Sequence, residues 1–344
     1  MGILLSACWL MAGCSVIDDD LSDCGPAEEN YELNYQLRLV TNMETELQTE
    51  LETQLETELA TVANALRAHL TDIFTEYAHD VDLSFYDTEG KLERLQHDTH
   101  LMEAKQKSYT LTLPMRQYLH LAVANIADNP VVGLEGDKYS NSSELRQAAA
   151  TVSDGFPTGV LTSHTTGLFT ARQPMEVLED VSQTFNVHLY MANSAASLVL
   201  NPKGQTFTDI KVYTTGFAES FQISDSTYVF PATSPLIKAD KVETTNEMLC
   251  FCSVNFPSRD AAPASVKKRA STNPTLWQFK VYLTKPDGKV TETILDISEP
   301  LKAGDLKIIK GELDDDGAVR PYDSKVGVSV QLDWNDGGNY DTPL

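Results

Sequence analysis

Basic side chains are scarce in this chain of 344 residues. It has 26 Lys and Arg against 50 Asp and Glu, which gives a formal net charge of -24 at pH 7. Such an acidic surface repels phosphates and anionic lipid headgroups, so nucleic acid and anionic lipid are poor partners. Tryptophan is also scarce, with three residues, which leaves few indole rings for a sugar-stacking platform, although tyrosines are available.

Signatures of catalysis are missing as well. The sequence has no Gly-x-Ser-x-Gly, no His-Glu-x-x-His and no glycine-rich phosphate loop. Its seven histidines are scattered, and the closest pair, His97 and His100, lies three apart in a strand-like stretch. Their side chains then face opposite sides and do not share a metal. We therefore expect no enzyme activity, no metal and no cofactor.

No stretch is long and apolar enough to be a transmembrane helix. The first apolar run, Ile3 to Ala12, has ten residues, whereas a bilayer of about 30 Å needs about 20 helical residues. The run ends at Met11-Ala12-Gly13-Cys14, small residues directly before a cysteine, as a lipoprotein signal peptidase requires. This predicts a cleaved signal peptide over residues 1–13, although no Lys or Arg precedes the run. We expect Cys14 to carry diacylglycerol and a further acyl chain such as palmitate, which anchor it stably.

The residues after Cys14 are expected to form an acidic tether over residues 14–30. Between Ser15 and Ala60 the chain has thirteen acids and one base. The acidic cluster directly behind the cysteine resembles the surface-export signal of Bacteroidales lipoproteins, and a plain polar tether is the alternative. The candidate export residues are Asp18, Asp19 and Asp20. These features predict a lipid-anchored protein of the outer membrane that is exposed on the cell surface.

The five cysteines leave three in the mature chain, because Cys8 is removed with the signal and Cys14 is acylated. Three is an odd number, so at least one thiol stays unpaired within the chain. Cys250 and Cys252 lie two apart in an apparent strand, with Cα atoms about 6.6 Å apart, near the upper limit for a disulfide. A bridge from Cys24 to one of them is geometrically easier, and two free core thiols are the alternative.

Two periodicities describe the first part of the mature chain. Tyr31 to Val40 alternates apolar and polar residues, as a strand with one buried face does. A near-repeat of four residues follows, and its apolar face continues to Tyr77. The spacing predicts one long amphipathic helix that packs against a sheet. The positions on this face are Leu47, Leu51, Leu55, Leu59, Val62, Leu66, Leu70, Ile73 and Tyr77.

The rest of the chain has the period of strands. Short strands broken by turns such as Pro286 to Gly288 argue for antiparallel β-sandwiches. We expect a mainly β protein, with an amino-terminal sandwich and the helix over residues 31–174 and a second sandwich over residues 175–344. The last predicted strand, Val326 to Trp334, is followed by a ten-residue tail without alternation. The chain is therefore predicted to accept a strand from a partner or to terminate a polymer.

Several segments resemble one family in their order along the chain. The run from Cys14 to Cys24, C-S-V-I-D-D-D-L-S-D-C, precedes an alternating strand and resembles the start of the FimB-like fimbrial anchor family of Bacteroidales, the fimbrillin-associated lipoproteins. Val81 to Leu92 is similar to a segment of the family in which a strand, an Asp, a turn glycine and a second strand follow one another. Tyr109 to Pro114 and Tyr118 to Asn125 resemble its lipid-distal hairpin in pattern, without the glycine that is common near Gln117. The correspondence runs on to Val328 through Trp334.

This resemblance implies two transthyretin-like β-sandwich domains in tandem. It also implies a pilus anchor at the base of a fimbria, which holds the polymer to the outer membrane, limits its length and pairs strands with the fimbrial stem subunit. The alternative function is a fimbrial tip adhesin or a surface glycan-binding lipoprotein of the same architecture. The repeat at Thr45 to Ala60 departs from the family as a local expansion of the first helix.

Overall fold

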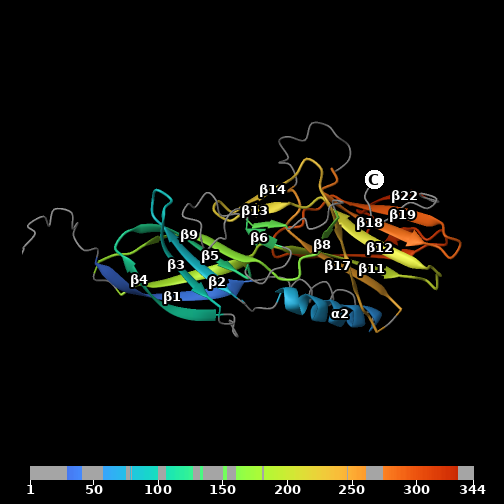
Figure 1. Ribbon diagram of the computed structural model, residues 1–344. Coiled ribbons are helices and arrows are strands. Elements are labelled where there is room, and N and C mark those ends of the chain that lie inside the picture. The colour runs from blue at the N-terminus through green and yellow to red at the C-terminus, as the bar shows by residue number, and fades with distance from the viewer. Residues whose placement is uncertain are drawn as a thin grey trace, which may run out of the picture.

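The computed structural model is an elongated protein in which strands predominate (Figure 1). One group of strands lies at one end, a second group lies at the other, and helix α2 (Thr57–Phe74) runs beside the second. Within the part of the chain that the structure describes, no helix is long and apolar enough to cross a membrane. The described residues are 29–40, 57–74, 78, 80–99, 106–126, 132–134, 150–152, 160–179, 182–245, 247–260 and 274–331.

A seven-stranded sheet forms the first group. Its strands are β1 (Asn30–Val40), β2 (Val81–Tyr86), β3 (Leu92–Asp98), β4 (Gln106–Pro114), β5 (Gln117–Ala124), β9 (Phe169–Glu176) and β10 (Thr184–Met191), in the order β3-β2-β5-β9-β10-β1-β4. The alternation predicted for β1 is confirmed, because Leu33, Tyr35 and Leu37 are buried and the residues between them are not. β1 pairs in parallel with β10 and antiparallel with β4.

The seven-stranded sheet folds over on itself and becomes a sandwich. Its two end strands meet, because Asp98 of β3 accepts hydrogen bonds from Lys107 and, at 3.1 Å, from the Tyr109 hydroxyl of β4. The Arg94 guanidinium of β3 also donates to the Thr112 carbonyl of β4. Both edges of the sheet are thereby protected.

A buried histidine joins the two layers across the interior of this sandwich. His120 of β5 and Tyr35 of β1 are hydrogen-bonded, with 2.7 Å between the imidazole Nε2 and the hydroxyl. The imidazole Nδ1 lies 2.9 Å from the Ser84 carbonyl and the ring stacks on Phe85. Because a carbonyl oxygen only accepts, Nδ1 carries the proton and Nε2 of the neutral ring accepts from Tyr35. Burial lowers the pKa of His120 to about 4.

β9 and β10 are consecutive strands that separate almost at once. They pair only through Tyr190 with Thr170 and Met191 with Phe169, at the end of the hairpin farthest from its loop. Beyond these pairs β9 stays bonded to β5, while β10 stays bonded to β1. The two strands therefore belong to different layers, and the sheet folds between them.

Two sheets form the second sandwich. The five-stranded sheet, in the order β16-β17-β11-β20-β21, contains β11 (Ser194–Asn201), β16 (Asp240–Val242), β17 (Leu249–Asn255), β20 (Leu306–Leu313) and β21 (Val319–Pro321). The six-stranded sheet, in the order β22-β19-β18-β12-β15-β8, contains β8 (Val160–Thr162), β12 (Asp209–Thr215), β15 (Leu236–Lys238), β18 (Trp277–Thr284), β19 (Val290–Ile297) and β22 (Gly327–Gln331). Trp277, Phe279 and Leu295 of one sheet share a buried core with Leu198 and Ile309 of the other.

A small four-stranded sheet packs on the outer face of the first sandwich. It contains β6 (Val132–Leu134), β7 (Ala150–Val152), β13 (Ser220–Gln222) and β14 (Thr227–Val229), in the order β14-β13-β7-β6. Phe221 of β13 shares a buried cluster with Phe256 and with Leu121 and Val123 of β5. This sheet therefore gives the outer face of β5 an apolar cover.

The first sheet extends past the expected boundary between residues 174 and 175. β9 spans that point, and β10 continues the same sheet to Met191. One strand from the range 31–174, β8, lies in the second sandwich, where it pairs in parallel with β15. Strand patterns in a sequence show which face of a strand is buried but do not show which sheet the strand joins.

The crossover from the first sandwich to the second is held by a buried asparagine. Asn193, between β10 and β11, is fully buried. Its side-chain oxygen accepts a hydrogen bond from the Leu168 N–H at 2.6 Å, and its side-chain nitrogen lies 2.6 Å from Nδ1 of His164. Its carbonyl accepts from the Gly304 N–H at 2.7 Å. Segments of both sandwiches are therefore tied to one residue.

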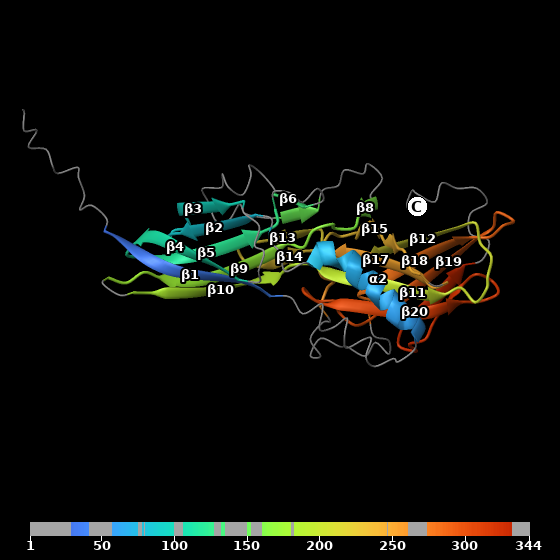
Figure 2. The same ribbon diagram turned by 90° about the horizontal axis from the view of Figure 1, so that it is seen from below.

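Helix α2 lies on the second sandwich, whereas the sequence led us to place it with the first. Figures 1 and 2 both show α2 against β17 and β11, and it contacts β16. Its buried side chains Val62, Leu66 and Leu70 belong to the predicted apolar face. The helix is described over 18 residues, and the remainder of the stretch predicted to be helical, back to Leu47 and on to Tyr77, lies outside the described residues.

Helix α2 covers a face of β17 that bears two thiols. Cys250 and Cys252 are fully buried in the same cluster as the apolar face of α2. Both are free within the described residues. Cys24, the other half of the expected bridge, lies outside them, so that pairing stays a prediction. Burial raises the pKa of Cys252 to about 12 and also raises the pKa of Cys250 well above its usual value.

We expect both buried thiols to resist Ellman's reagent at pH 8 in the folded mature chain, studied as the Cys24→Ser variant. The thiolate is the reacting form, and burial beneath α2 disfavours it. When the same variant is unfolded in guanidinium chloride, Ellman's reagent should react with both thiols at once. Fast labelling of the folded chain would contradict this arrangement of α2 over Cys250 and Cys252.

Acid should weaken the first sandwich through His120. Its folded pKa of about 4 lies below the unfolded value of about 6.5, so its contribution to the free energy of unfolding is complete above pH 6.5. That contribution is lost as the pH falls toward 4, by up to about 3 kcal/mol. The change in the urea unfolding midpoint between pH 7 and pH 4.5 should be smaller in His120→Gln than in the wild type. The control is His188→Gln at an exposed site, and equal changes in all three chains would refute the effect.

Candidate functional site

The residues that the sequence assigns to lipid attachment and export lie outside the described residues. These are Cys14, Asp18, Asp19, Asp20 and Cys24. Lipidation and surface export therefore remain predictions. The structure shows two other surface features that bear on function, a strand edge on the second sandwich and a pocket on the first.

Within the described residues, no three His, Cys, Asp or Glu side chains are grouped so that they could hold a metal ion. His97, one of the two closest histidines in the sequence, is paired with Asp82 of the neighbouring strand β2. The hydrogen bond and charge of Asp82 raise the pKa of His97. His100 lies outside the described residues.

The strand edge is formed by β22, the last strand of the six-stranded sheet. β22 pairs with β19, where Val328 lies opposite Leu295 and Val330 lies opposite Thr293. Leu295 and Thr293 are buried, and directly opposed residues share one face of a sheet. The two valines therefore continue the row of side chains that faces the core, yet they are 43% and 46% exposed. Within the described residues the opposite sheet does not extend over this row.

The other described sheet edges are protected in ways that β22 is not. β3 and β4 are joined to each other, β16 lies against α2, and β21 contains Pro321. The edges β6, β8 and β14 are three residues long. β22 reads Gly-Val-Ser-Val-Gln, with neither charge nor proline. An uncharged edge with exposed apolar side chains is a surface to which another chain can add a strand.

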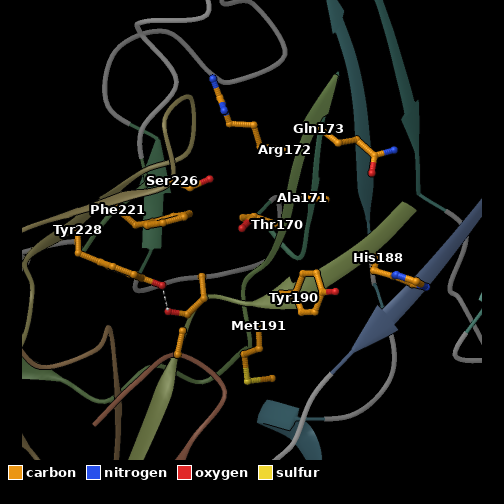
Figure 3. Close-up of a pocket in the computed structure, with 12 residues that line it drawn as sticks. Thr170, Ala171, Arg172, Gln173, His188, Tyr190, Met191, Phe221, Ser226 and Tyr228 are labelled. Carbon is orange, nitrogen blue, oxygen red and sulfur yellow. Dashed lines mark hydrogen bonds between the residues drawn. The ribbon is translucent and has the colours of Figure 1, made fainter. Parts of the chain in front are cut away.

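The pocket lies where β9 and β10 separate (Figure 3). Its volume is about 380 Å³. The first sandwich supplies most of the wall, the four-stranded sheet supplies the opposite side, and one residue comes from the second sandwich. The lining residues are Thr170, Ala171, Arg172, Gln173, His188, Tyr190, Met191, Ala192, Phe221, Ser226, Tyr228 and Ala303.

Hydrogen bonds and ring packing fix two parts of the pocket. The Tyr228 hydroxyl donates to the Ala192 carbonyl at 2.8 Å, and its ring packs on Phe221 with centroids 4.6 Å apart (Figure 3). Burial raises the pKa of Tyr228, so this hydroxyl remains a donor. At the rim, Nε–H of Arg172 donates to the Ser224 carbonyl at 2.7 Å. These contacts hold the Tyr228 ring and the Arg172 side chain in place.

Tyr190 is the exposed aromatic residue of the pocket. Its side chain stands on the outer face of β10 and is 58% exposed. The His188 ring lies edge-on to it, with centroids 6.4 Å apart. The Tyr190 hydroxyl makes no hydrogen bond within the described residues. The pocket therefore combines a free aromatic face with nearby polar side chains.

Sequence reasoning did not single out these pocket residues. The alternation of β10, T-F-N-V-H-L-Y-M, does put His188 and Tyr190 on the face opposite Val187 and Leu189, so their exposure could have been predicted. The pocket itself depends on the separation of β9 from β10 and on very short strands from distant parts of the sequence. No local pattern signals either feature.

The chain matches the sequence model of one protein family over residues 45–335, described as fimbrillin-A associated anchor proteins Mfa1 and Mfa2. No curated protein sequence matches it. Similar solved structures include a candidate adhesin from Bacteroides thetaiotaomicron, with 11% identity, a TM-score of 0.50, and coverage of 86% of this chain and 95% of that one. The fimbrial anchor protein Mfa2 from Porphyromonas gingivalis has 12% identity and a TM-score of 0.45, with coverage of 88% and 99%. The C-terminally truncated tip fimbrial protein Mfa3 from the same organism has 11% identity and a TM-score of 0.45, with coverage of 89% and 100%.

The family match extends over most of the chain and through both sandwiches. The family is one of fimbrial anchor proteins and not of enzymes. The resemblance to fimbrial anchor proteins that the sequence segments predicted is confirmed. The chain belongs to the family of fimbrillin-A associated anchor proteins Mfa1 and Mfa2.

Proposed function

We propose that this protein is an outer-membrane lipoprotein that anchors a fimbria to the cell surface and limits its length. Membership of the anchor family supports a role in a fimbria. The predicted signal peptide and Cys14 supply the lipid attachment, and the acidic cluster at Asp18 to Asp20 supplies export to the cell surface. In this proposal the two sandwiches are the two transthyretin-like domains that the resemblance to the family implies.

The edge of β22, which no described residue covers, carries the proposed mode of attachment. A fimbrial stem subunit adds a strand beside β22, and main-chain hydrogen bonds join the two proteins. The added strand also covers Val328 and Val330, which are exposed although they continue the core-facing row. Removing this apolar surface from water stabilises the complex. A chain that accepts a strand and offers none to a further subunit ends the polymer at its base.

Replacing Cys14 with Ala tests the lipid attachment. Without the acyl chains the anchor and its polymer should leave the cells, because one protein no longer holds both the membrane and the fimbria. We expect fimbrillin to move from the cell-bound fraction to the medium while total fimbrillin stays unchanged, as measured by immunoblotting. Cys8→Ala, in the predicted signal peptide, is the matched control. If the polymer stays on the cells and only adherence to a surface or glycan falls, the protein is a tip or binding module and not an anchor.

The double variant Val328→Lys/Val330→Lys tests the strand edge. Both side chains are exposed, so the fold should persist, but two lysines on the edge should oppose addition of a strand. We expect the stem subunit that co-purifies with the lipidated chain to fall by at least about tenfold, since burial of even one of the two valines contributes about 1.5 kcal/mol. Val229→Lys on β14 is the matched control, because Val229 is also 43% exposed.

Removal of residues 335–344 distinguishes the role of the β22 edge from the role of the tail that follows it. The tail lies outside the described residues, and we expect its loss to leave fimbrial attachment intact. If attachment is abolished while the protein is still folded and exported, the tail and not β22 holds the partner. Normal attachment of the double lysine variant would equally count against β22.

A further inference from the structure

The six-stranded sheet has a buried apolar cluster on its outer face. Tyr213 and Tyr282 directly follow the core residues Val212 and Val281 along β12 and β18, so they point away from the core of the second sandwich. Their rings lie edge-on, with centroids 5.9 Å apart, and Val290 of β19 belongs to the same cluster. The three side chains are only 2%, 9% and 1% exposed, in the order Tyr213, Tyr282 and Val290.

No helix or sheet in the described part of the chain lies over this outer face. The five-stranded sheet packs on the inner face, α2 lies on the five-stranded sheet, and the four-stranded sheet packs on the first sandwich (Figures 1 and 2). A tyrosine on a bare sheet face keeps much of its surface in water, as Tyr190 does at 58%. Because Tyr213 is buried within a single chain, its cover comes from this chain and not from a partner.

The row of side chains through Tyr213 is cationic. Lys238 of β15 and Lys280 of β18 lie directly opposite Tyr213, one on each side. Neither ammonium group forms an ion pair within the described residues. The acids of this face lie on its other rows, and the third lysine is within 4.0 Å of one of them; these residues are Asp209, Glu292, Asp296 and Lys211. An acidic segment with apolar side chains would therefore complement the row and the cluster together.

We propose that the C-terminal segment, residues 332–344, lies across this outer face and covers it. The segment reads L-D-W-N-D-G-G-N-Y-D-T-P-L and has three aspartates, two aromatic rings and no base. Its aspartates match Lys238 and Lys280, and its rings and leucines match the cluster around Tyr213.

The position and length of the C-terminal segment fit this placement. It directly follows β22, which is the edge strand of the same sheet. At about 3.3 Å per residue, thirteen extended residues span about 43 Å. Six strands that are about 4.8 Å apart form a face about 24 Å wide. The segment is therefore long enough to cross from β22 past β12.

The two other segments that adjoin this sheet outside the described residues fit the face less well. Residues 261–273, which precede β18, contain Lys267-Lys268-Arg269 and no acid, so Lys238 and Lys280 repel them. Residues 153–159, which precede β8, have one acid and are tied at both ends to strands, β7 and β8. Charge and connection to the sheet therefore both favour residues 332–344.

The docked segment has a consequence for assembly that deepens the proposed function. A segment held on its own sheet is not available as a strand for a neighbouring subunit. This agrees with a chain that accepts a strand and ends the polymer. The docking itself is a property of the isolated chain, so its failure in the experiments below would leave the anchoring role untouched.

Acetylation of lysines in the detergent-solubilised full chain tests the cover, with mass spectrometry as the readout. Removal of residues 332–344 should raise the initial acetylation rate of the half-buried Lys280 at least about fivefold, because the segment no longer shields it. Lys307 of β20 is also half-buried but lies on the other sheet, so its rate should not change. An unchanged rate at Lys280 would overturn the proposal, since another segment would then cover the face.

Cleavage of the full-length chain by chymotrypsin after Trp334 or Tyr340 tests the charge pairing. Lys238→Glu/Lys280→Glu should speed the loss of the tail at least about fivefold, as followed by intact mass, because the aspartates of the segment then face like charges. The fold should persist, since Lys238 is exposed and Lys280 is half-buried.

Two further variants make this cleavage test specific. Lys302→Glu/Lys307→Glu carries the same change of charge away from the face and should be cleaved at the wild-type rate. Replacing the three aspartates of the segment with lysine in the Lys238→Glu/Lys280→Glu chain should restore protection, because the charges are exchanged. Equal cleavage of the two glutamate double variants, or no recovery in the exchanged chain, would overturn the proposal.

Discussion

The parallel pairing of β1 with β10 is the constraint on which the first sandwich depends. It joins residues that are about 150 positions apart in the sequence, from Asn34 with Thr184 to Val40 with Tyr190. β10 follows β1 along its length and pairs with β9 only at Tyr190 and Met191. The sheet therefore folds between β9 and β10, which brings Tyr35 over His120 in the interior and opens the pocket on the outside. One long-range pairing thus produces both the core contact and the surface cavity.

The sequence predicted the helices and strands of this protein better than it predicted how they pack together. Alternation identified β1, and the leucine spacing identified the buried face of α2, because burial of one face leaves a period in the residues. The same periods do not say what covers that face, so α2 was expected on the first sandwich and lies on the second. A last strand was predicted over Val326 to Trp334 and β22 is described over Gly327–Gln331, but the sequence did not place it at the edge of a sheet. Its uncovered valines follow only from the register with β19.

The acidity of the chain and the open edge of β22 complement each other. A strand edge without charge or proline invites pairing between identical copies, which natural proteins commonly prevent with charged residues on the edge itself. Here β22 carries no such charge, but each copy has a formal net charge of -24. Mutual repulsion of whole molecules therefore opposes self-association, while the edge stays open to a partner with a different charge distribution.

The direction of β1 determines how the molecule bears mechanical load. β1 begins at the end of the protein remote from the second sandwich and runs along the long axis, while β22 lies near the other end (Figure 1). Tension applied between residue 30 and β22 therefore pulls β1 along its own length between β4 and β10. All the hydrogen bonds of β1 to these two strands then share the force and resist it in shear, instead of breaking one after another as in peeling.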